Sequence, residues 1–289
     1  MNERKTFFSF FILLETLLLA SSLSLNGMNR AQAIADEKAG LLQLLGISPS
    51  PESFDYVRNK TQFQLHTLLT EQRHPKTWNL SYELEKDFES GLRLLFSVDD
   101  DISQRLEALS KETDALEQAA QAIEDSLLSG KKIYIYGCGA TGRLAKQMES
   151  TFWRPFWEKA KKAGRIRKKI ERRLGKDIED RLIGEMTGGD RALISSLEGF
   201  EDLQLIGRLQ LEDRRVEKGD VVICVTEGGE TSSVIGTVLA GLDRWKKADA
   251  YQPEKTKRYL YFICNNPEQR LHPFERSRKV LEEPGITKI

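Results

Sequence analysis

Hydrophobic positions beyond residue 98 follow two periods that predict alternating helices and strands. Residues 99–101 are three aspartates, whose carboxylates favour a helix start. Apolar side chains then recur at helical spacing up to Gly130, at Ile102, Leu106, Leu109, Leu116, Ile123 and Leu127. Apolar runs of strand character follow at 132–136, 220–226 and 258–264, with a weaker one at 182–186. Helix-length segments separate these runs, which predicts an α/β fold with a mainly parallel sheet.

The amino-terminal third divides differently. Residues 6–25 contain twelve Phe, Ile or Leu side chains and a single charge, Glu15, and residues 31–33 form a small-x-small cleavage pattern. This pattern is typical of a secretory signal or membrane anchor. A mis-assigned start, with Met28 as the initiator, or a hydrophobic first helix are the alternatives. We therefore predict an apolar segment at 1–33, an irregular or helical lead-in at 34–98 and the α/β domain at 99–289.

Composition limits the classes of partner. Lys and Arg number 44 and so do Asp and Glu, so no global field attracts nucleic acid or an anionic membrane. Residues 159–176 hold ten basic side chains and one acid, which is more typical of a solvated helix face than of a nucleic-acid site. Three widely spaced cysteines favour unpaired thiols in a reducing compartment rather than disulfides or a zinc cluster. We expect a cytoplasmic protein without a metal or nucleic-acid partner.

The first predicted strand ends in a glycine loop, residues 137–143, GCGATGR. Glycines allow a sharp turn and close approach of an anion, and the helix that follows offers unpaired N–H groups. The loop fits G-x-G-x-x-G, which is a weak signal by itself. A dinucleotide site needs a second strand ending in an acid about 20 residues on, but residues 151–162 are rich in Trp, Phe and Lys and follow no run of strand character. An NAD-binding site is therefore disfavoured, and we predict no cofactor.

A second strand-to-helix junction, residues 226–233, reads TEGGETSS. Four hydroxyls and two glycines at a helix start suit a phosphate, which would accept hydrogen bonds from hydroxyl and backbone donors. Ordinary helix capping by Thr231 or Ser232 is the alternative. The carboxyl ends of parallel strands share one edge, so we expect the two loops to face one crevice.

At these residues the chain resembles the sugar isomerase (SIS) domain family, in the branch of N-acetylmuramic acid 6-phosphate etherase and the glucokinase regulatory protein. Four segments carry the resemblance: TEQRHP (70–75), GCGATGRLA (137–145), TGGDRALISSLEGFED (187–202) and VTEGGETSSVIGT (225–237). It implies a three-layer α-β-α fold with a five-stranded sheet that binds a phosphosugar. It also implies a set of ligand-binding residues: Gly137, Gly139, Ala140, Thr141, Glu198, Thr226, Gly228, Gly229, Thr231 and Ser232.

The etherase relatives use two carboxylates as general acid and base. Glu198 matches one of them, but Thr151 stands where the resemblance implies the other. Glu149 would point away from the site, and Glu227 or Glu230 are candidate substitutes. We therefore favour a regulator that senses a hexose phosphate, with Glu198 accepting hydrogen bonds from the sugar. The alternative is an etherase-like lyase or a sugar-phosphate isomerase, with Glu198 catalytic.

The resemblance also implies partners. A sugar kinase is the candidate partner of a regulator of this type. The family continues beyond the segment that matches residues 284–289, so we expect a truncated chain whose sheet lacks its last strand. A second copy of the chain or a missing second SIS domain would complete it.

Overall fold

The computed structural model describes residues 46, 50–60, 64–112, 114–247 and 251–289. The chain forms two units, residues 1–64 and residues 65–289. In the first unit, α3 spans Pro51–Asn59, and the Ser50 hydroxyl accepts a hydrogen bond from the Ser53 N–H at the helix start. The predicted apolar segment, residues 6–25, lies outside the described residues. No helix among the residues that are described is long and apolar enough to cross a membrane.

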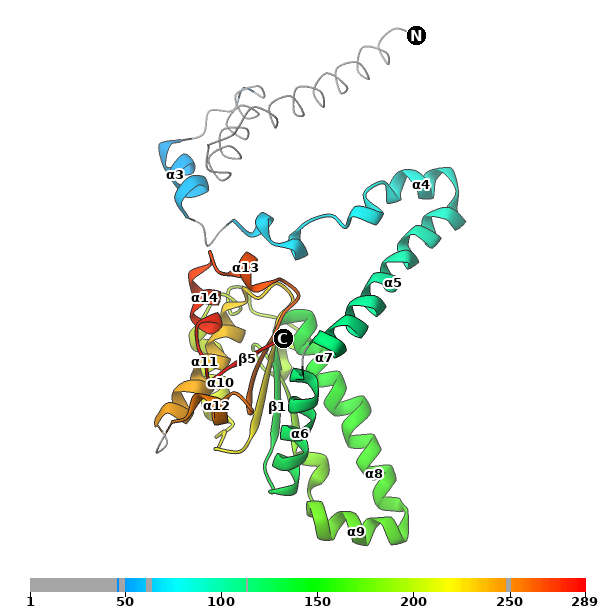
Figure 1. Ribbon diagram of the computed structural model, residues 1–289, viewed down its shortest axis with the longest axis vertical. Helices are drawn as coiled ribbons and strands as arrows, with labels where there is room; N and C mark the ends of the chain where they lie inside the picture. The colour runs from blue at the N-terminus through cyan, green and yellow to red at the C-terminus, as the bar shows by residue number, and fades with distance from the viewer. Residues whose placement is uncertain (1–45, 47–49, 61–63, 113, 248–250) are drawn as a thin grey trace. The chain divides into compact units, whose positions relative to one another are not determined.

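A five-stranded, all-parallel sheet organises the second unit, in the order β2-β1-β3-β4-β5 (Figure 1). The strands are β1 (Ile133–Gly137), β2 (Leu182–Met186), β3 (Val221–Val225), β4 (Leu260–Ile263) and β5 (Thr287–Lys288). The four predicted runs are thus confirmed as strands to within two residues at either end. Our prediction that the last strand is missing is wrong. β5 pairs with β4, but two residues are too short for a recognisable apolar run.

Helices connect the strands. Before the sheet lie η2 (Leu65–Thr67), η3 (Leu69–Glu71), η4 (Pro75–Thr77), α4 (Leu80–Lys86), α5 (Phe88–Glu112) and α6 (Ala115–Leu128). Between β1 and β2 lie α7 (Gly139–Gln147), a π-helix η5 (Met148–Trp153), α8 (Arg154–Lys162), α9 (Gly164–Leu174) and η6 (Ile178–Asp180). The remaining helices are η7 (Asp190–Leu193), α10 (Gln204–Asp213), α11 (Ser232–Lys247), α12 (Pro253–Thr256), α13 (Glu268–Leu271) and α14 (Glu275–Leu281).

Alternation along β1 divides the core between the two faces of the sheet. Tyr134 and Tyr136 pack with side chains of α10, α11 and α14, whereas Ile133 and Ile135 pack with α6, α7 and η5. Successive strand residues point to opposite faces, so a strand buried on both sides reads as a continuous apolar run. The sheet therefore forms the middle layer of the predicted three-layer α-β-α fold.

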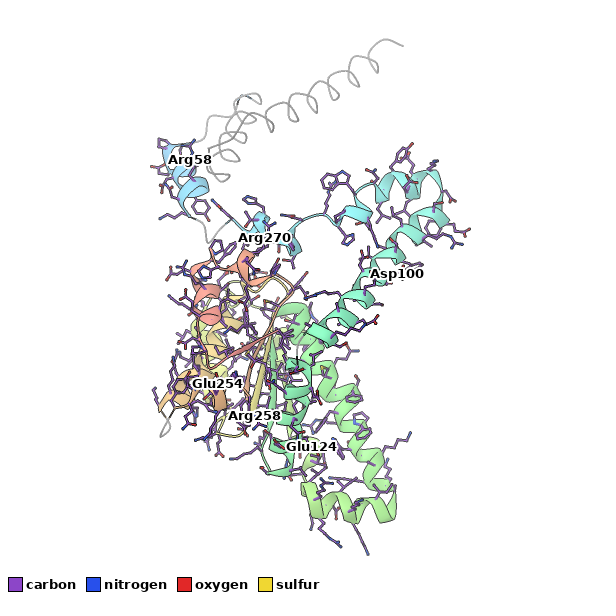
Figure 2. The ribbon with its side chains drawn as sticks, in the orientation of Figure 1. Arg58, Asp100, Glu124, Glu254, Arg258 and Arg270 are labelled. Carbon is purple, nitrogen blue, oxygen red and sulfur yellow. The ribbon has the colours of Figure 1, made fainter. Side chains whose placement is uncertain are left out.

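The helix predicted to begin at residues 99–101 begins earlier. Asp87 precedes α5 and accepts the Ser90 N–H at 2.9 Å, and hydrogen bonds from Ser90 hold the pKa of the Asp87 carboxyl below its usual value. Asp100 lies within α5 (Figure 2), and Asp101 pairs with Lys76 at 2.6 Å. Ile102 and Leu106 are more than half exposed, so this part of the predicted core face is not buried among the described residues.

Candidate functional site

The two predicted loops lie at the same edge of the sheet. β1 and β3 are adjacent parallel strands, and Gly137 at the end of β1 stands opposite Val225 at the end of β3. The first glycine loop (residues 137–143) and the second loop (residues 226–233) therefore start side by side. Thr187 follows the neighbouring strand β2, and its N–H donates to the Gly137 carbonyl at 3.0 Å. This is the carboxyl edge, where open α/β sheets bind ligands.

The first glycine loop turns directly into α7. A Cβ on Gly137 would lie 2.5 Å from the Thr141 carbonyl carbon, so no larger residue fits this turn. The Thr141 hydroxyl accepts from the Cys138 N–H at 3.1 Å and lies 2.9 Å from the Cys138 carbonyl oxygen, to which it donates. Thr141 thus closes the turn through local hydrogen bonds.

A cavity of about 120 Å³ adjoins this loop. Two of the predicted residues, Gly139 and Glu198, line it, together with Arg143 and Glu201, which the sequence analysis did not select. Arg143 is exposed on α7 and supplies a positive charge, whereas Glu198 and Glu201 supply two carboxylates from one loop. The cavity thus offers charged donors and acceptors to a polar, anionic molecule.

The hydroxyls of the second loop bind one another. The Thr226 and Thr231 hydroxyl oxygens are 2.9 Å apart, and the Gly229 N–H donates to Thr226 Oγ1 at 3.4 Å. Thr226 is only 2% exposed and Ser232 only 4%. The Ser232 hydroxyl also accepts a hydrogen bond from the Arg276 guanidinium. The second loop does not line the described cavity, so the structure places its residues next to the cavity rather than around it.

A buried hydroxyl network joins the two loops behind the cavity. Ser233 is fully buried, its hydroxyl lies 2.9 Å from Thr187 Oγ1, and its N–H donates to the Glu201 carbonyl at 2.9 Å. Thr187 in turn lies 3.2 Å from the Tyr136 hydroxyl, and burial raises the pKa of Tyr136 above its usual value. Each hydroxyl is satisfied by another, so the network fixes the loops relative to each other.

Comparison with known proteins identifies the domain. Residues 114–242 match the family described as glucokinase regulatory protein N-terminal SIS domain. This part of the chain is thus similar to a SIS domain. It is also similar to proteins named N-acetylmuramic acid 6-phosphate etherase from cyanobacteria. The resemblance stated from the sequence is thus confirmed at the level of the family.

Three of these relatives show how much of the chain is aligned with each of them. The protein from Picosynechococcus sp. (strain ATCC 27264 / PCC 7002 / PR-6) is 29% identical over 184 residues, 62% of this chain and 52% of the relative. The protein from Synechocystis sp. (strain ATCC 27184 / PCC 6803 / Kazusa) is 30% identical over 186 residues, which are 62% of this chain and 51% of the relative. The protein from Prochlorococcus marinus (strain MIT 9313) is 31% identical over 173 residues, which are 58% of this chain and 46% of the relative. The chain spans about half the length of the curated relatives it matches.

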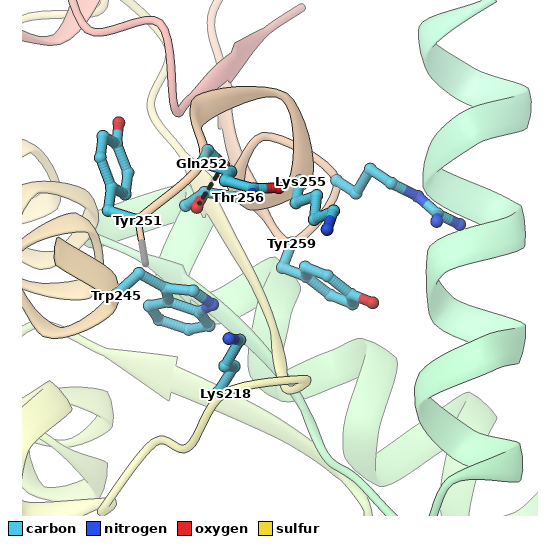
Figure 3. Close-up of a pocket in the computed structure, with 8 residues that line it drawn as sticks. Lys218, Trp245, Tyr251, Gln252, Lys255, Thr256 and Tyr259 are labelled. Atoms are coloured by element: carbon cyan, nitrogen blue, oxygen red, sulfur yellow. Dashed lines mark hydrogen bonds between the residues drawn. The ribbon is translucent and has the colours of Figure 1, made fainter. Parts of the chain in front are cut away.

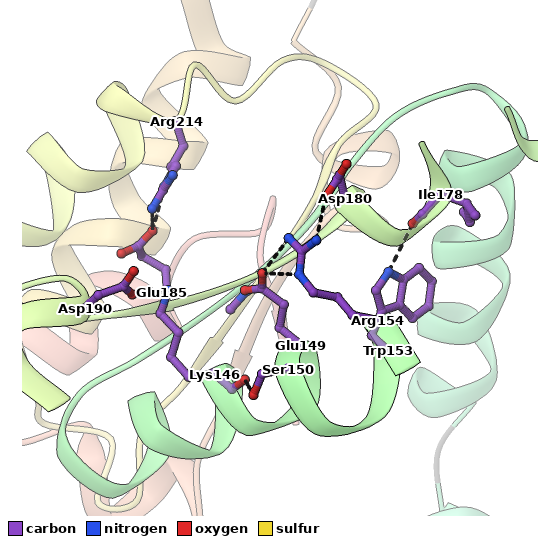
Figure 4. Close-up of polar contacts among 11 residues, drawn as sticks. Lys146, Glu149, Ser150, Trp153, Arg154, Ile178, Asp180, Glu185, Asp190 and Arg214 are labelled. Carbon is purple, nitrogen blue, oxygen red and sulfur yellow. Dashed lines mark hydrogen bonds and ion pairs between the residues drawn. The ribbon is translucent and has the colours of Figure 1, made fainter. Parts of the chain in front are cut away.

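Two of the residues considered for a second carboxylate, Glu149 and Thr151, lie in the π-helix η5. Glu149 accepts the Gly184 N–H of β2 at 2.8 Å and pairs with Arg154 at 2.8 Å (Figure 4). It is thus used to attach the helix to the sheet edge, as expected for a group that points away from the site. The Thr151 hydroxyl donates to the Gln147 carbonyl at 2.7 Å, which satisfies it within its own helix.

Residues 68–70 form the segment that lies against the second loop. Leu68 is 1% exposed and packs with Leu271 and Phe274. Asn266 donates from Nδ2 to Thr70 Oγ1 at 2.9 Å and to the Gly228 carbonyl at 2.8 Å, and its Oδ1 accepts from the Leu69 N–H at 2.8 Å. The TEQRHP segment, which begins at Thr70, is therefore tied to the loop through a single side chain. No such link follows from the spacing of these residues in the sequence.

Glu230 is the titratable group of the second loop. Burial raises its pKa to about 7, against opposing contributions from the hydrogen bond with Ser277 and from Arg276. A carboxyl whose pKa is raised on folding favours the folded state below its unfolded pKa, and this contribution is lost as the pH rises through the folded pKa. Glu230 therefore reduces the stability of the folded chain progressively between pH values of about 4.5 and 7.

We expect Glu230→Gln to remove this pH dependence. The free energy of unfolding of the variant should exceed that of the wild type by an increasing amount from about pH 5 to about pH 8, since Gln carries no charge to desolvate. Urea unfolding at several pH values measures this. Glu227→Gln, which alters the exposed acid of the same loop, is the matched control and should leave the wild-type profile in place. Parallel profiles for wild type and Glu230→Gln would contradict the prediction.

Among the described residues, no three His, Cys, Asp or Glu side chains gather into a group that could hold a metal ion.

Proposed function

We propose that this SIS domain binds a phosphorylated sugar at the carboxyl edge of its sheet and acts as a sensor of that sugar phosphate. The observation that carries the proposal is the cavity in which Arg143, Glu198 and Glu201 surround the start of α7. Arginine recognises phosphate through charge-assisted hydrogen bonds, and carboxylates accept hydrogen bonds from sugar hydroxyls. The relatives named for an N-acetylmuramic acid 6-phosphate activity support the same ligand class.

The absence of a carboxylate at Thr151 favours a sensor over a catalyst. Acid/base chemistry needs two groups of suitable charge near the substrate, and the Thr151 hydroxyl is bonded to its own helix. A protein that binds a sugar phosphate without converting it can report on its concentration to a partner. In the regulator we propose, that partner is a sugar kinase.

Etherase activity is the second candidate, and one observation favours it. Glu198 and Glu201 line the same cavity, so the site holds two carboxylates despite the substitution at position 151. One would act as base and the other as acid. Incubation of the purified chain with N-acetylmuramic acid 6-phosphate separates the two functions: release of lactate supports the etherase and contradicts a pure sensor.

Binding tests the proposal itself. Fructose 6-phosphate, glucose 6-phosphate and N-acetylmuramic acid 6-phosphate are each titrated in a thermal-shift assay and by calorimetry, and at least one should raise the melting temperature of the wild-type chain. Arg143→Ala should weaken binding about tenfold or more, because a charged hydrogen bond contributes roughly 1.5–3 kcal/mol.

The control for this variant is Arg191→Ala, which removes an exposed arginine that does not line the cavity. It should leave the affinity unchanged. Failure of all three sugar phosphates to bind would contradict the proposed function, and equal losses in both variants would contradict the role of Arg143.

A further inference from the structure

A second cavity, of about 240 Å³, lies at the opposite edge of the sheet (Figure 3). Lys218 precedes β3, and Arg258 and Tyr259 precede β4, so the cavity is at the amino ends of these strands. Its remaining lining comes from the end of α11 and from α12 with the residues before it: Trp245, Tyr251, Gln252, Lys255 and Thr256. It shares no lining residue with the candidate sugar-phosphate site.

The charged side chains that line this cavity are all positive among the residues that the structure describes. Lys218, Lys255 and Arg258 line it, and none of the described lining residues is acidic. Arg258 pairs with Asp125 at 3.0 Å. Lys218 and Lys255 form no ion pair with any described residue. Two ammonium groups that lack an ion-pair partner in the described part of the chain favour an anion beside the cavity, and lysine commonly binds phosphate as a point charge.

Aromatic side chains flank the same space. In Figure 3 the amino group of Lys218 lies beside the Trp245 indole, and the amino group of Lys255 lies near the Tyr259 ring. Aromatic side chains stack on flat rings such as nucleobases, and this stacking contributes about 1–3 kcal/mol of binding free energy per base. A sugar phosphate lacks such a ring, so the cavity suits a different ligand from the one proposed for the carboxyl edge.

Trp245 also has an unsatisfied donor. Its side chain is 5% exposed, and its indole N–H is buried without a hydrogen-bond acceptor among the described residues. Buried polar groups are nearly always paired, and an unpaired one requires an explanation. Figure 3 shows the indole nitrogen on the side of the ring that faces Lys218. An acceptor atom of a ligand held by Lys218 would satisfy it.

We propose that this cavity binds a nucleoside monophosphate, with the base between Trp245 and Tyr259 and the phosphate at Lys218 and Lys255. The inference is independent of the proposed sugar-phosphate function because it uses other residues at another edge of the sheet.

Calorimetric titration of the full chain with AMP and with UMP tests it. At least one of the two should bind saturably. Adenosine lacks the phosphate and ribose 5-phosphate lacks the base, and each should bind at least about tenfold more weakly, since each loses one of the two interactions. The titrations are repeated with Arg143→Ala, which should weaken binding of ribose 5-phosphate at the carboxyl edge about tenfold, so that binding at the second cavity is compared with less competition from that site.

Two variants locate the binding. Lys218→Ala and Lys255→Ala alter exposed side chains, so both should fold, and each should raise the dissociation constant for the nucleotide about tenfold. Lys168→Ala on α9 removes the same charge outside the cavity and should have no effect. The proposal is overturned if neither nucleotide binds saturably. It is also overturned if the Arg143→Ala variant binds ribose 5-phosphate as tightly as it binds the nucleotide, or if Lys218→Ala and Lys255→Ala both keep the wild-type affinity for the nucleotide.

Discussion

Gly207→Ala is expected to lower the free energy of unfolding by about 3 kcal/mol or more, at or above the upper end of the usual cost of overpacking. Gly207 lies on α10, where a Cβ would be 1.9 Å from the Ser233 carbonyl oxygen and 2.4 Å from Thr237 Oγ1 on α11. The clash is with backbone, so it cannot be relieved by a rotamer change. The two helices would have to separate, and Ser233 would leave the hydroxyl network behind the cavity.

Urea unfolding measures the effect. Gly236→Ala places a Cβ 2.0 Å from the Gln204 carbonyl oxygen across the same helix contact and should cost a similar amount. Gly164→Ala is the matched control, because no atom lies within 4 Å of a Cβ at that position of α9. There the higher helix propensity of alanine should stabilise the chain slightly, by up to about 1 kcal/mol. Equal unfolding midpoints for Gly207→Ala and Gly164→Ala would show that α10 and α11 are not in such close contact.

Asn266→Ala should have the second largest effect, a loss of about 2–3 kcal/mol, because three hydrogen bonds of a buried amide are removed together. Asn266 is 5% exposed and joins Leu69 and Thr70 to the Gly228 carbonyl. We also expect residues 65–77 to become more accessible, so trypsin should cleave after the exposed Arg73 faster than in the wild type.

Unfolding midpoints and the rate of limited proteolysis are the two measurements. Asn265→Ala changes the exposed neighbour, for which the described contacts include a backbone N–H bond to Glu227 but no side-chain bond, and is the matched control. The idea that Asn266 attaches this segment to the second loop fails if both variants are cleaved at the same rate.

The hydroxyls of the second loop show where prediction from the sequence stopped. Their composition correctly indicated a special strand-to-helix junction, and the parallel sheet brought it beside the first glycine loop. Composition could not tell which hydroxyls face a ligand. Thr226 and Thr231 satisfy each other, and Ser232 accepts from Arg276, a residue 44 positions further along the chain. Partners this distant depend on how α14 packs, which no local pattern encodes.

The sequence by itself determined the α/β class, the segments that form four of the strands and the position of both loops. These features depend on local periodicity and on glycine in tight turns, both of which can be read within a few residues. Three other features were decided by the tertiary structure alone. They are the short strand β5, the presence of Arg143 beside Glu198 and Glu201 around one cavity, and the cavity lined by cationic and aromatic side chains at the amino ends of the strands. Each of these joins segments distant in the chain, so it exists only once the sheet and its two helical layers have packed together.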